Sequence, residues 1–553
     1  MKEYRFISYL VNQYDPIDVC FCVQSITGNE PREVSLEDLC KFSDETIVTY
    51  SLPLLVEAIR VRGLTLPANI LDIEQAGRLI IGHSHTEYIS QLPWSIWSLL
   101  ESYVTNKSLL DTVKNWHYRS VPIPDERTII SSLIELNKNI IKLWADQLNE
   151  LDKNDELKRF MNIELPINTL LLDRQYKGIK INSSKLHARL DKLDSFVSFN
   201  TEELRKRWGL LDLSNTKALS QSLNYLGYTN LSNIIATKKQ NLFFTDQYTD
   251  ICSDITDDWI ELFRSYHGVK KAQRDKKILL RFGAIGEERI YPFFEGIGTI
   301  TGRILVKSPS IQHLKKSSRD VIIADDGYKL LYPDFSQFEP GILADDSGDP
   351  NLITLYNSGD VYNALSSVLF NSKEHRDRKT AKRLFLAYSY GMSESRIAQF
   401  ISEITNQDVT VAQQLVNDFF GQFPEIPKWK ENLCEELLRN GRVGTREGNY
   451  RYRKNIRKKS LTDTEKRWVI SQHIQGTASL ILKRCILCIA KEIPEAQFLL
   501  PMHDAVLYQV PIELYDIAKI HIKKIFLDEY QKECQSIVPR VSFDAFWEED
   551  KGD

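Results

Sequence analysis

Residues 499–510 read LLPMHDAVLYQV, two apolar runs joined by the ionisable pair His503–Asp504. Such runs are typical of buried strands, and the short polar junction predicts a tight hairpin between them. A second aspartate, Asp334, follows the apolar run YKLLYP and is also predicted at the end of a strand. Two carboxylates on neighbouring strand ends could hold two Mg²⁺ ions about 3.5–4 Å apart, an arrangement that supports phosphoryl transfer. The alternative is that each aspartate is an ordinary turn residue.

A helix predicted at 374–403 carries a second signal. Four of its residues recur at every fourth position and therefore share one face: Arg378, Lys382, Leu386 and Tyr390. Two cations followed by an apolar and an aromatic residue suit a nucleoside triphosphate, with the phosphates on the cations and the base at the aromatic end. An amphipathic helix with a basic end is the alternative interpretation.

Five motifs follow one another between about residue 165 and the carboxyl terminus. They are YPFFEGIGTITGR (291–303), DFSQFEPGILADDSGD (334–349), RKTAKRLFLAYSYGMS (378–393), RWVISQHIQGTAS (467–479) and MHDA (502–505). In order and spacing they resemble the motifs of family A DNA polymerases, the bacterial DNA polymerase I type. This resemblance implies an α+β multidomain fold, a right-hand polymerase with palm, fingers and thumb. An RNase H-like exonuclease-type α/β domain would precede it.

The resemblance and the changes of texture along the chain predict five segments. They are a degenerate 3′–5′ exonuclease-like domain (1–150), the thumb with its connecting helices (151–285), the first part of the palm (286–349), the fingers (350–430) and the second part of the palm (431–553).

The resemblance also implies roles for individual residues. Asp334 and Asp504 would bind two Mg²⁺ ions, and Lys382 would donate a proton to the leaving pyrophosphate. The incoming dNTP would be bound by Arg378, Lys382, Leu386, Tyr390, Gln337 and Glu339, with Glu339 excluding a 2′-hydroxyl. Primer or template DNA would be contacted by Arg303, Gln312, Arg467, Gln475, His503 and, on the thumb, Lys270.

Several positions depart from the family pattern. Ala505 stands where a Glu usually follows the H-D pair, and Leu386 replaces an aromatic residue of the fingers helix. Pro340 and Gly341 stand where the first motif often reads Leu-Arg, and His313 replaces a common Asn. We expect catalysis to survive these changes, because two aspartates remain for the metal ions.

The amino-terminal segment lacks the usual exonuclease acids. Its first strand-like run, YRFISYLVNQYDP (4–16), has no D-x-E pair, and YSLPLL (50–55) stands where the family carries Asn and Asp. The DIE at 72–74 imitates the first exonuclease motif at a later position. We expect an inactive domain without proofreading. A working proofreading site and an unrelated domain are the alternatives, and we expect no 5′ nuclease region.

Composition limits the remaining possibilities. The chain of 553 residues has a net charge of −4, yet three runs are basic: 264–281, 373–383 and 451–459. Each run could be a solvated helix face, or together they could follow a phosphate backbone. Eight scattered cysteines predict reduced thiols, and Cys485 and Cys488 fit helix packing. With neither a signal peptide nor a membrane span expected, we predict a cytoplasmic protein of a bacterial or phage-infected cell.

The expected function is template-directed DNA synthesis by two-metal phosphoryl transfer. Primer–template DNA is the expected partner, replication accessory proteins are further candidates, and we expect a monomer. Two alternatives stay open: a polymerase that also copies RNA, and a primer–template binding protein with a decayed active site.

Overall fold

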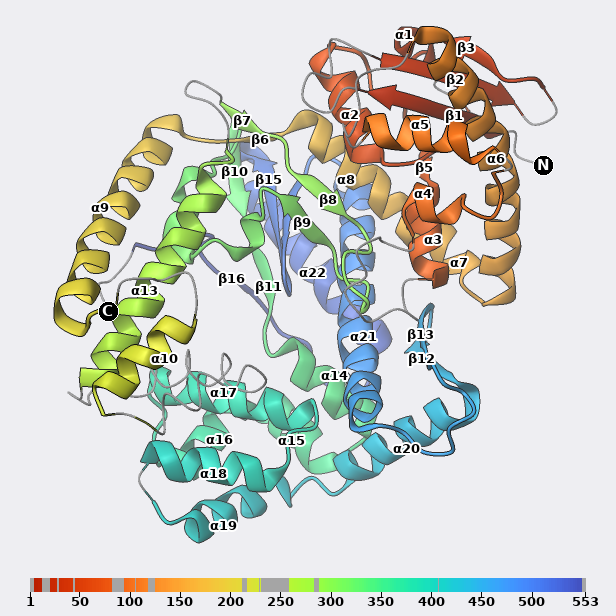
Figure 1. Ribbon diagram of the computed structural model, residues 1–553. Helices are drawn as coiled ribbons and strands as arrows, with labels where there is room; N and C mark the ends of the chain where they lie inside the picture. Colours follow the sequence, from red (N-terminus) through yellow and green to blue (C-terminus); the bar gives the residue numbers. More distant parts are fainter. Residues whose placement is uncertain are drawn as a thin grey trace.

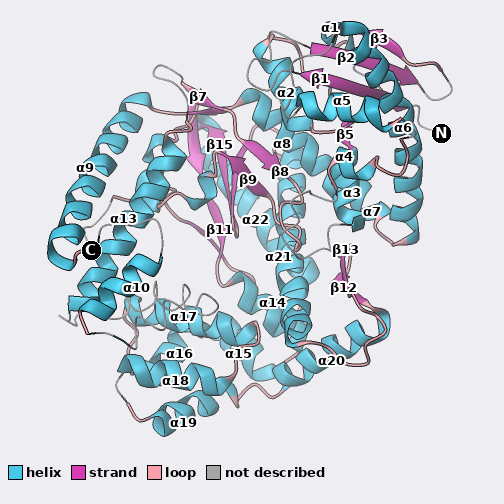
Figure 2. Ribbon diagram, viewed as in Figure 1, coloured by secondary structure: helices cyan, strands magenta, loops and turns pink. Residues whose placement is uncertain are grey.

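The computed structural model describes residues 4–11, 20–26, 29–42, 45–81, 94–104, 106–117, 125–210, 216–227, 229, 258–282, 288–405 and 407–549. Figure 1 shows an amino-terminal sheet at the upper right, a pair of long helices on the left and a helical layer at the bottom, all around a central sheet. Helices predominate outside the two larger sheets, as Figure 2 shows.

The amino-terminal domain is built on a five-stranded sheet of order β3-β2-β1-β4-β5. Its strands are β1 (Tyr4–Val11), β2 (Cys20–Ile26), β3 (Arg32–Val34), β4 (Thr46–Thr49) and β5 (Ile70–Asp72). The first three are antiparallel, whereas β1, β4 and β5 run parallel. The three strands expected from RFISYLV, DVCFCVQ and TIVTYS are therefore confirmed as β1, β2 and β4.

Six helices surround this sheet: α1 (Leu36–Leu39), α2 (Leu52–Val61), α3 (Ile73–Ile81), α4 (Ile96–Leu99), α5 (Lys107–His117) and α6 (Glu126–Lys153). The longest, α6, begins at the N-cap Asp125, whose side chain accepts a hydrogen bond from Thr128 N. The domain has a hydrophobic core of its own, which Phe160, Leu172 and Ile297 from the following segments complete.

A continuous helical connection leads from the amino-terminal domain into the rest of the chain. It comprises α7 (Leu157–Arg159), the π-helical turn η1 (Phe160–Glu164) and α8 (Leu165–Lys177). Arg159 and Glu164 form a buried ion pair (Nε–Oε1 2.9 Å), and Lys483 Nζ lies 2.6 Å from the other oxygen of Glu164. One carboxylate thus neutralises two buried cations from segments more than 300 residues apart.

The helical pair on the left of Figure 1 consists of α9 (Ser183–Trp208) and α13 (Asp258–Leu279), with α10 (Thr216–Tyr225) at one end. Asn182 caps the start of α9 by accepting a hydrogen bond from Lys185 N, and Gly209 ends it with φ +64°. A small separate core holds the helices together, formed by residues that include Leu204, Trp208 and Leu262.

The central sheet has the order β10-β15-β11-β16, with β14 paired along the opposite edge of β15. Its strands are β10 (Tyr328–Leu331), β11 (Pro333–Phe335), β14 (Gln497–Met502), β15 (Ala505–Pro511) and β16 (Val541–Phe543). In Figure 1 the long helix α22 (Tyr515–Glu533) lies behind the sheet, and α21 (Asp463–Glu492) lies to its right. Smaller elements complete this part: β6 (Ile179–Lys180), β7 (Arg289–Ile290), β8 (Phe293–Glu295), β9 (Leu305–Ser308), η2 (Ile311–His313), η3 (Lys316–Val321) and η4 (Ile512–Leu514).

The layer at the bottom of Figure 1 is helical. It contains α14 (Phe338–Ser347), α15 (Pro350–Ser358), α16 (Val361–Phe370), α17 (His375–Ser389), α18 (Glu394–Thr405), α19 (Val409–Phe420) and α20 (Glu425–Asn440), followed by the hairpin β12 (Arg442–Thr445) and β13 (Gly448–Tyr452). The single helix expected at 374–403 is two helices, α17 and α18. Gly391 adopts φ +92° between them, a conformation that ends an α-helix.

The buried triad Arg159–Glu164–Lys483 gives the first prediction. Replacing Glu164 with Ala leaves two buried cations without a counter-charge, which costs about 3–5 kcal/mol. Urea denaturation followed by circular dichroism should show this loss. Glu202→Ala removes an exposed ion pair with Arg205 and should lower the stability much less, because water and salt screen this pair. Equal effects of the two substitutions would contradict the structural role of the triad.

Candidate active site

The central sheet brings Asp334 and Asp504 together. Strands β11 and β15 are antiparallel, with Asp334 directly opposite Ala505, and Phe335 N donates to the carbonyl oxygen of Asp504 (3.3 Å). Two residues far apart in sequence therefore occupy adjacent positions at one end of the sheet, as their predicted strand-end positions required.

The predicted hairpin is present. Strands β14 and β15 pair up to Met502 and Ala505, so His503 and Asp504 form a two-residue turn. His503, the first residue of this turn, has φ +61°. A positive φ at this position is typical of a type II′ turn, in which the residue is usually glycine. A non-glycine residue held in this region is a local strain that the surrounding sheet must stabilise.

Burial and like charges act on both aspartates. Burial, followed by the negative charges of Asp504 and Asp544, raises the pKa of Asp334 to about 7, while Lys382 and Lys316 oppose this rise. Burial also raises the pKa of Asp504, against the attraction of Arg303 and Lys382. The metal-free pair therefore resists carrying two negative charges, which a divalent cation would reverse.

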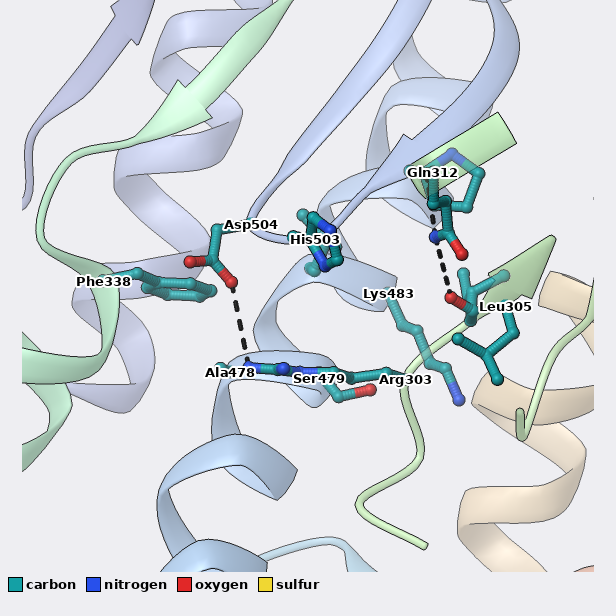
Figure 3. A pocket seen from close by; sticks show the side chains of 12 residues that line it. Arg303, Leu305, Gln312, Phe338, Ala478, Ser479, Lys483, His503 and Asp504 are labelled. Atoms are coloured by element: carbon teal, nitrogen blue, oxygen red, sulfur yellow. Dashed lines mark hydrogen bonds and ion pairs between the residues drawn. The ribbon is translucent and has the colours of Figure 1, made fainter. Parts of the chain in front are cut away.

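Arg303 links the two acidic positions of the site. Its Nη2 lies 2.6 Å from Oε1 of Glu339 and 4.0 Å from Oδ1 of Asp504, and Figure 3 shows the latter ion pair. Glu339 is largely buried, and burial followed by the charge of Asp504 raises its pKa. One guanidinium thus holds Glu339 next to the turn formed by His503 and Asp504.

The α17 residues lie as the four-residue spacing predicted. Arg378 donates from Nε and Nη2 to Oδ2 of Asp360 (3.2 and 2.6 Å), the N-cap of α16. The ring of Tyr362 lies under both cations, 5.4 Å from the Arg378 guanidinium and 5.8 Å from Lys382 Nζ. The positive charge of Lys382 also opposes the rise in the pKa of Asp334 and of Asp504.

Tyr362 is a site residue that the sequence analysis missed. It is buried, and burial followed by the charges of Glu339 and Asp504 raises its pKa. The available signal was its position two residues after Asp360, an aspartate typical of a helix N-cap. Nothing in the sequence alone linked that helix to α17.

The other two residues of this helix face, Leu386 and Tyr390, lie near α21. Leu386 is half-buried in the last turn of α17, and Tyr390 caps its carboxyl end. The Tyr390 hydroxyl is buried beside Glu339 and Gln475, and its pKa is raised by burial and by the charge of Glu339. A Cβ on Gly391 would lie 3.4 Å from Cγ of Arg467, so this residue also reaches the end of α17.

Two predicted contact residues have internal partners. Gln312 Nε2 donates to the carbonyls of Ile304 (3.1 Å) and Pro501 (2.9 Å), and its Oε1 accepts from Val306 N (3.0 Å). Gln337 has φ +52° and accepts a hydrogen bond from Val361 N (2.9 Å). Both amides hold backbone segments of the site in place, and their contacts with DNA or dNTP stay predictions.

A pocket opens beside the catalytic turn (Figure 3). It is lined by residues from four segments: Arg303, Ile304, Leu305, Gln312, Phe338, Ala478, Ser479, Leu482, Lys483, Pro501, His503 and Asp504. Desolvation and the positive charges of Arg303, His313 and Arg319 lower the pKa of His503, which favours a neutral imidazole in the turn. Lys270 lies on α13, outside this pocket.

The structure explains one departure from the family pattern and bears on another. A Cβ on Gly341 would lie 2.2 Å from the hydroxyl of Tyr530 and 2.8 Å from the ring of Tyr356, so only glycine fits this turn of α14. Strand β16 pairs with β11 on the side away from Ala505, placing Ser542 opposite Asp334. Asp544 follows two residues later, and its charge acts on Asp334. A third negative charge beside Asp334 thus comes from just beyond β16, not from position 505.

Among the described residues, no group of three or more His, Cys, Asp or Glu side chains is arranged to hold a metal ion by itself. Two converging carboxylates still fit Mg²⁺, because this ion commonly takes one or two protein carboxylates and completes its shell with water and substrate phosphates. Asp334 and Asp504 are the pair that would hold it.

The amino-terminal acids are used differently. Asp72 Oδ1 accepts from Glu74 N (2.8 Å), and the Glu74 carboxylate accepts from Ser51 N (3.1 Å) and Ile96 N (2.7 Å). Burial raises the pKa of both carboxyl groups. These acids cap backbone N–H groups inside the domain, an arrangement that favours the predicted loss of exonuclease chemistry.

Comparison with known proteins identifies the family. The model for DNA polymerase family A matches residues 185–543. This match spans more than half of the chain and includes the catalytic turn, α17 and α21, so the chain belongs to DNA polymerase family A.

Relatives and solved structures agree with this assignment. The thermostable DNA polymerase I of Thermus aquaticus is 31% identical over 41% of this chain and 28% of its own length. DNA polymerase I of Caldicellulosiruptor bescii is 24% identical over 69% of this chain and 46% of its own length. The chain therefore spans less than half the length of these curated relatives.

A solved structure has the same fold along nearly the whole chain. It is the POL domain of Pol1 from M. smegmatis in complex with DNA primer-template and dNTP, with a TM-score of 0.74 and 16% identity over 98% of this chain and 94% of that chain. The predicted α+β multidomain fold of a right-hand polymerase is confirmed. None of the described helices combines the length and apolar character needed to cross a membrane.

The raised pKa of Asp334 predicts how stability depends on pH. An aspartate with a raised folded-state pKa favours folding in its protonated form, so its contribution is complete below about pH 4 and is lost as the pH rises through about 7. The melting temperature of the metal-free protein should therefore fall between about pH 4 and pH 7 and level off above that range, and the increase caused by Mg²⁺ should be larger at about pH 8 than at about pH 6. Differential scanning fluorimetry measures both effects.

The matched control is Asp334→Asn, which removes the titrating carboxyl group. In this variant the increase caused by Mg²⁺ should become smaller and nearly independent of pH. A variant that retains the pH-dependent effect of Mg²⁺ would show that other groups are responsible.

Proposed function

We propose that this chain is a template-directed DNA polymerase. It adds deoxyribonucleotides to a primer 3′-hydroxyl and releases pyrophosphate. The observation that carries the proposal is the convergence of Asp334 and Asp504 with the cations of α17 and with Glu339, in a chain of family A. A decayed DNA-binding protein would not be expected to retain all of these groups in one place.

Asp334 and Asp504 hold two Mg²⁺ ions in this proposal. When bound there, the metal ions lower the pKa of the primer hydroxyl and neutralise charge on the leaving pyrophosphate. The protein contributes a rigid sheet that fixes the separation of the two carboxylates, and Asp544 adds a third negative charge beside Asp334. Arg303 lies close enough to offset the charge of Asp504 before the metal ions arrive.

The triphosphate binds along α17. Arg378 and Lys382 contact its phosphates, with Lys382 donating a proton to the pyrophosphate as it leaves. The ring of Tyr362 faces both cations and helps to hold them in position. Its hydroxyl adds a hydrogen-bond donor for a phosphate oxygen. Leu386 and Tyr390 pack near the sugar and the base, and Gln337 fixes the start of α14 under the nucleotide.

Glu339 selects the sugar. Its carboxylate is buried and held by Arg303 (2.6 Å), so it cannot move away easily from a 2′-hydroxyl. A ribonucleotide would either clash with Glu339 or disturb this ion pair. Deoxyribonucleotides avoid both costs.

The DNA lies across the palm. Arg303, His503 and Gln475 contact the primer end and the new base pair, Gln312 supports them from the palm, and Arg467 lies on the template side. Contacts in the minor groove suit this task, because acceptors there occur in every correct base pair. Lys270 and the basic run of α13 contact duplex phosphates from the thumb.

The proposal also includes the predicted domain boundaries at residues 150, 285, 349 and 430 and an amino-terminal domain that lacks proofreading.

Two alternatives are a polymerase that also copies RNA and a DNA-binding protein without catalytic activity, and one primer-extension assay separates them. Extension of a DNA primer on DNA and RNA templates, with deoxyribonucleotides or ribonucleotides and Mg²⁺, distinguishes them.

Removal of either metal-binding carboxylate tests the catalytic assignment. Asp334→Ala and Asp504→Ala should each lower the rate of single-nucleotide insertion at least about 10³-fold, equivalent to about 4 kcal/mol. Rapid-quench measurements on a DNA primer–template supply the rates. Asp516→Ala, an exposed change on α22, is the control. Insertion by Asp504→Ala at the control rate would refute the proposed metal site.

Replacement of Glu339 tests sugar selection. Glu339→Ala opens space beside the sugar, and we expect ribonucleotide insertion relative to deoxyribonucleotide insertion to rise on the order of tenfold or more. The ratio of kcat/KM for the two nucleotides measures this preference. Because the change also frees Arg303, primer binding should be measured in parallel. An unchanged ratio with intact primer binding would assign sugar selection to another residue.

A further inference from the structure

The loop between β13 and α21 has exposed cations that the proposed catalytic mechanism does not use. It contains most of the basic run RYRKNIRKK (451–459). The side chains of Arg457, Lys458 and Lys459 are exposed, and among the described residues no acidic group forms an ion pair with them. Three adjacent cations without counter-charges create a local positive potential on a chain that is slightly acidic overall.

A buried arginine holds this loop from the inside. The Arg453 side chain is only 1% exposed, and its guanidinium donates to the carbonyls of Lys458 (3.3 Å) and Ser460 (3.2 Å). Its Nε donates to Glu465 Oε1 (3.0 Å), and Glu465 also completes a capping box with Thr462 at the start of α21.

This arrangement has an electrostatic consequence. Glu465 is engaged by Arg453 and by the helix cap. Among the described residues, neither Glu465 nor Asp463 forms an ion pair with Arg457, Lys458 or Lys459, and Arg453 fixes the backbone that carries these three cations. Preorganised charges lose less conformational entropy on binding than free lysine side chains on a mobile loop.

The loop precedes the end of α21 that carries Arg467, the residue proposed to lie on the template side of the site. Helix α21 runs from the loop past Arg467, whose Cγ would lie 3.4 Å from a Cβ on Gly391 at the end of α17, to Gln475 beside Tyr390. The primer-side pocket lies farther along the same helix, at Ala478–Lys483. At 1.5 Å per residue the start of α21 is about 18 Å from Gln475, on the side opposite this pocket.

We propose that the loop 454–459 binds the phosphate backbone of the single-stranded template before it enters the active site. This proposal rests on the proposed function, which sets the direction of the template along α21. Lysine and arginine contacts to phosphates attract the strand without reading its sequence, as a polymerase requires. At a stacked spacing of 3.4 Å per nucleotide, about five unpaired nucleotides would span from Gln475 to the loop.

The test neutralises three exposed cations together: Arg457→Gln, Lys458→Gln and Lys459→Gln. Fluorescence anisotropy, without nucleotide or Mg²⁺, compares one duplex with a 5′ template overhang of about ten nucleotides and the same duplex with blunt ends. We expect binding of the overhang DNA to weaken about ten- to hundredfold at about 0.1 M salt, with the slope of log K against log salt reduced by about 2. Binding of the blunt duplex should not change.

A control variant with the same change in net charge separates local binding from general attraction. It combines Lys491→Gln, Lys523→Gln and Lys524→Gln, all exposed and outside the loop. Equal weakening by the two triple variants, or equal weakening on blunt and overhang DNA, would overturn the proposal. An overhang series should show the defect only beyond about five nucleotides, and a defect at every length would also overturn it.

Binding is measured without catalysis, so the two proposals can fail separately. A chain that binds the overhang through this loop but never extends a primer would refute the proposed polymerase activity alone. A chain that extends primers while the loop variant binds every DNA like the unaltered protein would refute only the role of the loop.

Discussion

The antiparallel pairing of β11 with β15 is the constraint on which the site depends. It forces Asp334 next to the turn that carries Asp504, so two carboxylates share one end of a largely buried sheet. Burial and mutual repulsion raise the pKa of both, and only nearby cations make the arrangement tolerable. Arg303 and Lys382 supply part of that compensation from the protein. Divalent metal ions bound between the carboxylates would supply the rest.

The other parts of the chain position groups around this pair. Gly341 lets Tyr530 and Tyr356 pack against α14, which carries Glu339 in its first turn. The amide of Gln312 fastens β9 to the strand that leads into the catalytic turn. In the amino-terminal domain, by contrast, Asp72 and Glu74 have internal hydrogen-bond donors and cap the backbone. Carboxylates thus face one another at the end of the central sheet, whereas in the amino-terminal domain they accept hydrogen bonds from backbone N–H groups.

Much of the site could be predicted from the sequence, because short-range patterns encode it. An apolar run ending in Asp predicts a strand end, and a four-residue repeat of Arg378, Lys382, Leu386 and Tyr390 predicts one face of a helix. The roles that were missed depend on contacts across the chain. Tyr362 meets α17 only after the helices pack, and Asp544 reaches Asp334 only through the pairing of β16. The hydrogen bonds of Arg453 to the loop could not be predicted either, because the sequence of a basic run does not indicate which of its cations is buried.

A structure of the chain with primer–template DNA, an incoming dNTP and Mg²⁺ would test the central claim most directly. The account predicts metal density between the carboxylates of Asp334 and Asp504, with the triphosphate along α17 in contact with Arg378 and Lys382. A triphosphate bound elsewhere, or two aspartates that contact neither metal nor substrate in a complete complex, would contradict it.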